Sequence, residues 1–95
     1  MFEAVKRRLG IAEAIKTYDE DIQMYLDDCK QDMIASGVPE AVVNAGKEAV
    51  LTAATLYVSA YLGNDRTDTD QYLNLYRQKV FRLTLEPEGD EEDVE

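Results

Sequence analysis

The sequence predicts an all-α fold: a small bundle of about four helices, with a long buried central helix and a flexible acidic C-terminal tail. Apolar residues recur at spacings of three and four along most of the chain. No segment keeps the period-two alternation of a strand, apart from FRLTL at 81–85, which favours a short extended piece. With 95 residues and 45% apolar content, the chain fits one small domain.

The first segment, FEAVKRRLG, predicts a short amphipathic helix. Its apolar residues stand at helical spacing, at Phe2, Val5 and Leu9, and Gly10 ends it. The basic triplet at 6–8 lies between them, which favours charges that face water. Nucleic-acid binding would need a wider basic face than this sequence offers.

A second helix with one buried face is predicted from about Thr17 to Ala35. Its apolar stripe contains Tyr18, Ile22, Leu26, Cys29 and Met33. Thr17 or Tyr18 lies near its start, and the carboxylates at 19–21 complement the positive end of the helix dipole. Gly37 suits a left-handed C-cap, and Pro39 suits the first turn of the next helix. Cys29 on this stripe is interpreted as a packed thiol rather than a nucleophile.

Residues 39–62 predict the long central helix. It is apolar or small on nearly every side after Glu48, so it must be buried on more than one face. About 24 residues span roughly 36 Å, which is long for the core of so small a domain. Either other helices wrap it completely, or a neighbouring copy covers part of it. Close helix approach is favoured by small residues at Ala45, Gly46, Ala49, Ala53 and Ala54.

The stretch YLGNDRTDTDQY at 61–72 crowds carboxylates between two apolar runs. Its spacing fails to match the ligand pattern of a calcium-binding EF-hand loop. A short polar link also lacks the cleft that paired catalytic carboxylates need. Helix-end signals explain this stretch better. Gly63 and Asn64 suit a left-handed helix end, and Thr67 with Asp70 resembles a capping box.

The last helix is predicted from about Asp68 to Leu83. One side carries its larger apolar residues, Tyr72, Leu75, Tyr76, Val80 and Leu83. The basic residues Arg77, Lys79 and Arg82 lie toward its end, where cations oppose the negative end of the dipole.

The net charge of −10 is concentrated at one end of the chain. Seven of the 20 acidic residues lie in 86–95, which leaves 13 acidic against 10 basic residues in 1–85. We therefore divide the chain into a helical domain at 1–85 and a disordered acidic tail at 86–95. The tail is either a solubilising end or a segment that orders on a basic partner, or repels nucleic-acid phosphate.

The composition also limits the chemistry. The chain has no histidine and a single cysteine, so Ser/His and Cys/His nucleophilic pairs and histidine-containing zinc sites are absent. No apolar run approaches the length of a membrane span, and the charged N-terminus is unlike a signal peptide. We expect a soluble, non-enzymatic protein made in a cytoplasm, without cofactor or metal.

The order of the segments resembles a known family. AVKRRLGI, DEDIQMYLDDCKQDM and LYVSAYLGNDRTDTDQYLNLYRQKVFRLTL are similar to segments of the head-tail connector (adaptor) proteins of tailed bacteriophages and prophages. The most recognisable pattern falls on Tyr57, Val58, Tyr61, Gly63, Asp65, Asp68, Tyr72, Tyr76, Leu83 and Leu85. Leu62 departs from it, at a position that is usually aromatic, and the acidic tail lies outside it.

The resemblance implies a structural virion component at the head-tail interface. It implies a homo-oligomeric ring of about twelve subunits beneath the portal protein, which extends the DNA channel and receives a stopper or tail-completion protein. DNA would pass without sequence-specific binding, and no membrane is involved. Within this picture 39–62 is the scaffold and 63–69 a surface loop for a partner ring. Before assembly the subunit would reside in the host cytoplasm.

Two sets of residues are expected to make these contacts. The loop set is Gly63, Asn64, Asp65, Arg66 and Asp68. The tail-docking set is Leu85, Glu86 and Pro87, within a segment 84–95 that orders on docking. The alternative is a small acidic regulator, antitoxin-like or a DNA mimic, that binds a basic protein target.

Overall fold

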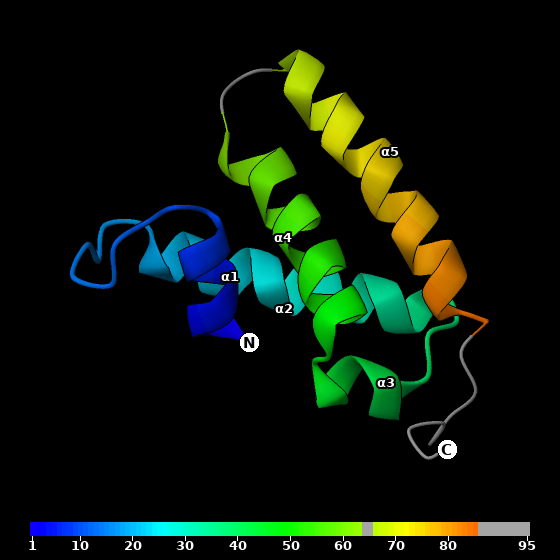
Figure 1. The fold of residues 1–95 in the computed structure, drawn as a ribbon. Helices are drawn as coiled ribbons and strands as arrows, with labels where there is room; N and C mark the ends of the chain where they lie inside the picture. Colours follow the sequence, from blue (N-terminus) through cyan, green and yellow to red (C-terminus); the bar gives the residue numbers. More distant parts are fainter. Residues whose placement is uncertain (64–65, 86–95) are drawn as a thin grey trace.

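A computed structural model describes residues 1–63 and 66–85, and this part of the chain contains five α-helices and no strand. The helices are α1 (Phe2–Arg8), α2 (Asp19–Ala35), α3 (Glu40–Ala45), α4 (Glu48–Leu62) and α5 (Arg66–Leu83). Figure 1 shows α4 and α5 side by side as an antiparallel pair, with α2 crossing behind them and α1 beside α4. The predicted all-α class is confirmed.

The predicted central helix at 39–62 is divided into α3 and α4, which makes five helices instead of about four. The break lies at Gly46, whose φ of 61° and ψ of 38° are left-handed. Lys47 then adopts extended geometry at the N-cap position of α4, without a side-chain capping hydrogen bond. Glycine reaches φ > 0 without the steric cost that a Cβ imposes, so it ends a helix where alanine would continue it. The prediction treated Gly46 only as a small residue for packing.

The core is built around α4, against which α2, α5 and α1 pack. No residue from Val50 to Ala60 is exposed, because α2, α5 and α1 all pack against this helix. Helices of this chain therefore cover much of the central helix, while Glu48, Ala49 and Tyr61 stay exposed. Of the small residues expected to allow close packing, Ala53 and Ala54 are fully buried, whereas Ala45 and Ala49 are exposed. Burying a largely apolar helix on several faces removes apolar surface from water and stabilises the fold.

The boundaries of α2 agree with prediction. Tyr18 is its N-cap residue, and acidic side chains at 19–21 occupy its first turn. The fully buried positions of its stripe are Ile22, Leu26, Cys29 and Met33. Gly37 follows with a φ of 110°, the left-handed geometry expected at this helix end.

Three details near α5 differ from prediction. Gly63 is extended, with a φ of −77° and a ψ of 166°, so it is not a left-handed helix end. Thr67 lies inside α5, which begins at Arg66, so it cannot be the residue that caps this helix. At 81–85 the chain stays helical to Leu83 and then turns, because the Leu85 N–H bonds the Arg82 carbonyl at 3.1 Å. The predicted strand-like piece is therefore wrong.

The stripe of α5 is also narrower than predicted. Tyr76, Val80 and Leu83 are buried against the core, and Tyr72 is partly buried. Leu75 is exposed, since a step of one residue turns a helix by about 100° and carries it away from Tyr76.

Candidate assembly surfaces

The corner between α4 and α5 contains the residues of the predicted loop contact. Gly63 and the exposed Asp68 border a surface cavity of about 280 Å³, which is also lined by Leu9, Ile11 and Tyr72. Asn64 and Asp65 lie outside the described residues, and Arg66 is the first residue of α5. The structure thus brings Gly63 and Asp68 to the edge of one cavity, where the end of α1 meets the corner.

The backbone geometry of this corner restricts what Gly63 can be replaced by. The Gly63 N–H bonds the Ser59 carbonyl at 3.3 Å, and a Cβ added at Gly63 would also lie 3.3 Å from that oxygen. Thr69 Oγ1 donates to the Ala60 carbonyl at 2.8 Å, which ties the start of α5 to the end of α4. No group of three metal-ligating side chains occurs within 1–63 and 66–85.

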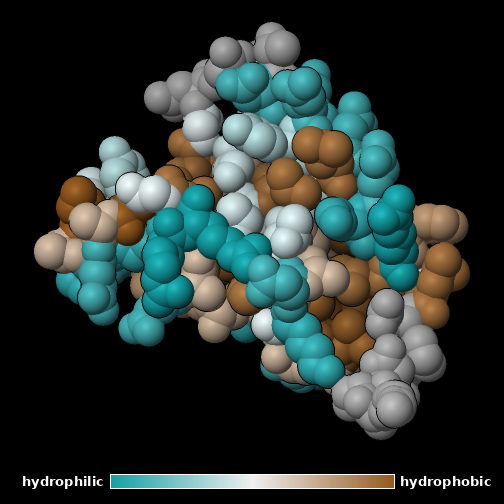
Figure 2. Space-filling view, viewed as in Figure 1, coloured by the Kyte–Doolittle hydropathy of each residue, from teal (hydrophilic) through white to brown (hydrophobic). Residues whose placement is uncertain are grey.

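The C-terminal end of α5 forms a second surface, which we call the α5-end face. It consists of Phe81 and Leu85, which are 65% and 69% exposed, flanked by the exposed Arg77 and Arg82. Beside Phe81 lies a groove of about 420 Å³ between α5 and the end of α2. Figure 2 shows hydrophobic residues at the right-hand edge of the molecule, at this end of α5. Of the predicted docking residues, Leu85 is described here, whereas Glu86 and Pro87 lie outside the described residues.

Phe81 was not singled out from the sequence, although a signal was present. It directly follows the buried Val80, so it points about 100° away from the core side of α5. A large aromatic side chain one step off an apolar stripe faces water unless another element covers it. Within the described residues Phe81 is left mostly uncovered.

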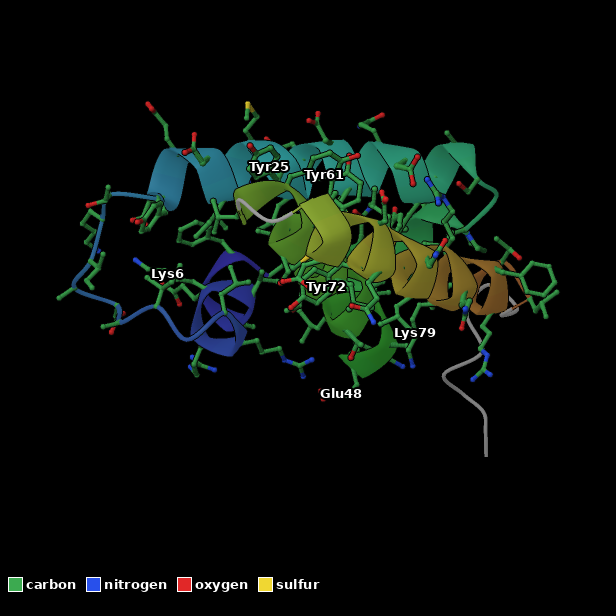
Figure 3. All side chains as sticks on the ribbon, turned by 90° about the horizontal axis from the view of Figure 1, so that it is seen from above. Lys6, Tyr25, Glu48, Tyr61, Tyr72 and Lys79 are labelled. Carbon is green, nitrogen blue, oxygen red and sulfur yellow. The ribbon has the colours of Figure 1, made fainter. Side chains whose placement is uncertain are left out.

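A third surface is the outer side of α2, which we call the α2 acidic face. Met24 lies at its centre, 50% exposed and directly opposite the buried stripe. Four exposed carboxylates surround it on the same side of the helix, those of Glu20, Asp21, Asp27 and Asp28. Figure 3 shows oxygen-tipped side chains of α2 pointing away from the rest of the molecule, while Lys79 lies on the opposite side.

A chain of aromatic contacts that the sequence did not reveal runs from the exposed Tyr61 to the buried Tyr76. Tyr25 and Tyr61 lie side by side (Figure 3) and stack, with ring centroids 5.7 Å apart. Tyr57 contacts both Tyr61 and Tyr76. The Tyr76 hydroxyl donates to Asp32 Oδ2 at 2.6 Å. These contacts join α2, α4 and α5, and Tyr57, Tyr61 and Tyr76 also belong to the pattern that suggested a family.

Cys29 lies against the same cluster, with its Sγ 3.8 Å from the Tyr76 hydroxyl. Burial raises the pKa of the Cys29 thiol to about 12, so the thiol is protonated at neutral pH. A buried, protonated thiol is a packing group, as predicted, and is a poor nucleophile.

The basic triplet of α1 is not uniformly solvated, which corrects the sequence-based expectation. Lys6 is buried, with its side chain 4% exposed. Its Nζ lies 2.7 Å from Asp19 Oδ1 and 3.1 Å from the Glu13 carbonyl oxygen, so it ties α1 to the following loop and to the start of α2. Arg8 pairs with Glu48 at the surface. An ammonium on a long aliphatic stem can be buried when oxygen atoms replace its hydration.

Comparison with known families identifies one that covers nearly the whole chain. The family model described as phage connector protein matches residues 1–90, a range that includes all five helices. No curated protein and no solved structure matches the chain. Within the described part, no helix has the length and apolar character to span a membrane.

Proposed function

The chain belongs to the phage connector protein family, and from this premise we propose that it is a head-tail connector (adaptor) subunit. A phage connector is a structural component of the virion. In the proposed role, copies of this chain form a ring beneath the portal protein. The ring extends the DNA channel and receives the stopper or tail-completion protein.

The observation that carries the proposal is the family match over 1–90. The structure supports a role in assembly in a second way. The chain covers its own central helix, yet it leaves Phe81 and Leu85 exposed at one end. Apolar residues that folding does not bury are available to a partner, and adjacent exposed ones are typical of interaction sites.

We assign two partner contacts to opposite ends of α5. The corner with Gly63 and Asp68 is proposed to meet a neighbouring ring, together with Asn64, Asp65 and Arg66. The segment from Leu85 through Glu86 and Pro87 is proposed to dock on the portal protein. The acidic residues of 86–95 would repel DNA phosphates near the channel, which favours sliding over binding.

The role is tested in the phage or prophage that encodes the chain. A stop codon early in the gene should yield DNA-filled heads without attached tails, and supplying the chain in trans should restore tailed particles. Electron microscopy of the restored particles should show the chain as a ring below the portal. Normal tailed particles without the chain would overturn the proposal and favour the acidic-regulator alternative.

The docking segment is tested by deleting 84–95. The truncated chain should keep its helical circular dichroism, because the buried residues of α5 end at Leu83. It should fail to assemble with the portal protein. As a matched control, replacing Asp70 by Asn changes an exposed carboxylate at the other end of α5 and should leave docking intact. Docking by the truncated chain would show that another surface binds the portal.

A further inference from the structure

We propose that Phe81, Arg77 and Arg82 of the α5-end face of one copy bind the α2 acidic face of the next copy, while Leu85 stays with the portal-docking segment, and that repetition of this contact builds the ring. The inference deepens the proposed function and depends on it, because it names the surfaces by which the subunits would meet. Each copy would use both faces at once, each with a different neighbour.

The α5-end face is apolar at its centre and basic at its flanks. Phe81 and Leu85 are the two most exposed of the large apolar residues described. Arg77 and Arg82 lie on either side of them, and no acidic residue occurs from 71 to 85. The carboxylate that lines the neighbouring groove, Asp32, already accepts a hydrogen bond from Tyr76. Neither arginine has an ion-pair partner among the described residues.

The α2 acidic face has the matching character with the opposite charge. Met24 supplies an exposed, flexible apolar side chain that adapts to an uneven surface. The four carboxylates around it have no ion-pair partner in the described part of the chain. Like charges crowded on one face repel one another, so a cationic partner would relieve this repulsion.

The placement of the two faces favours a second copy as the occupant. Met24 lies 12 positions before Ser36, a residue that lines the groove beside Phe81, and a rise of 1.5 Å per residue separates them by about 18 Å. Both faces therefore belong to one rigid unit and cannot close on each other. Two different complementary faces on each copy give a head-to-tail contact, which closes into a ring when the rotation permits.

Cysteine cross-linking tests the contact directly. A chain carrying both Met24→Cys and Phe81→Cys should form disulfide-linked multimers in assembled particles, because each link joins neighbouring copies. The native Cys29 is fully buried and should stay silent. The matched control combines Met24→Cys with Leu75→Cys, since Leu75 is exposed on α5 but lies on another side. Particles that contain the chain but show no multimers specific to the first pair would overturn the inference.

Charge reversal gives an independent test. Replacing Asp21, Asp27 and Asp28 by lysine leaves Glu20 as the one carboxylate of that face and makes both faces basic, and Arg77→Glu with Arg82→Glu makes both acidic. Each variant alone should lose ring assembly, while an equal mixture should regain it, because each acidic face then meets a basic one. Circular dichroism of both variants checks folding. Folded variants that assemble alone as well as the native chain, or a mixture that stays unassembled, would overturn the inference.

These tests separate the inference from the function on which it depends. If the chain is absent from virions, the proposed function fails. If the chain is present and Phe81→Cys cross-links to the portal or stopper protein instead, the function stands and the α5-end face has a different partner.

Discussion

The interior around α4 and the C-terminal end of α5 use apolar side chains in opposite ways. Around α4, Ala54 and Val58 are fully buried, and α2, α5 and α1 pack against this helix. At the end of α5, Phe81 and Leu85 are mostly exposed. Neither residue belongs to the buried core, so the fold does not require either side chain to be covered. The apolar residues that stabilise the fold are thus different from the apolar residues that we propose contact a partner.

The largest effect is expected at high pH, where ionisation of buried side chains should lower the stability of the fold. Burial raises the pKa of Cys29 and of Tyr57 to about 12, and raises the pKa of Tyr76 through burial and its hydrogen bond to Asp32. The unfolded chain ionises these groups at their ordinary, lower pKa values. Their contribution to stability is therefore complete below about pH 9 and is lost as the pH rises toward about 12.

Denaturant titrations at several pH values test this alkaline loss. The free energy of unfolding should fall steadily above about pH 9, with Cys29→Ala showing a smaller fall than the native chain because one titrating group is gone. An unchanged free energy of unfolding up to about pH 11 would contradict the contribution of these buried groups.

The next largest change in the free energy of unfolding is expected on the buried side of α2, in contrast to its outer side. Leu26→Ala should lower the free energy of unfolding by about 2–5 kcal/mol, because it leaves a cavity against α4. Met24→Ala on the outer side should change it by less than about 0.5 kcal/mol. Thermal or urea unfolding of both variants measures the difference. Similar losses would mean that the outer side of α2 is also packed.

The two ion pairs of α1 provide a smaller contrast. Lys6→Ala should cost about 2 kcal/mol, below the usual cost for a fully buried pair, because the Asp19 side chain is 30% exposed and can regain water. Arg8→Ala breaks the surface pair with Glu48 and should cost about 0.2–1 kcal/mol. Equal losses in urea unfolding would show that burial of Lys6 adds nothing.

The smallest effect on stability is expected at the α5-end face. Phe81→Ser should change the free energy of unfolding by less than about 0.5 kcal/mol, since the ring is mostly exposed. The same variant should reduce incorporation of the chain into particles, whereas Leu75→Ser should not. Calorimetry and the protein content of purified particles check the two halves of the prediction. A large loss of stability with normal incorporation would assign Phe81 to folding.

Most of the helices could be predicted because periodicity and caps are local. The stripe of α2 and its glycine terminator at Gly37 follow from residues within a few positions of one another. The break at Gly46 was missed, since a glycine amid small apolar residues suits both close packing and a left-handed turn. The predicted roles of Gly63 and Thr67 failed for the same reason: a loop sequence permits several geometries, and packing selects one.

The candidate surfaces were harder to predict than the helices. Leu85 and Asp68 were expected at the surface and lie there. The exposure of Phe81 and the burial of Lys6 depend on which helix covers each residue. The spacing of residues within one helix does not show which of them another helix will cover, because the covering residues are distant in the chain.

The sequence alone determined the all-α class, the extents of α1 and α2, the burial of Cys29, and the resemblance to a connector family. These depend on short-range periodicity, helix-end chemistry and residue order. Tertiary structure decided that α2, α5 and α1 pack against α4, that Lys6 pairs with Asp19, and that Phe81 stays exposed to solvent. Each of these results from contact between segments far apart in sequence, where the shape and the water accessibility of both partners set the free energy.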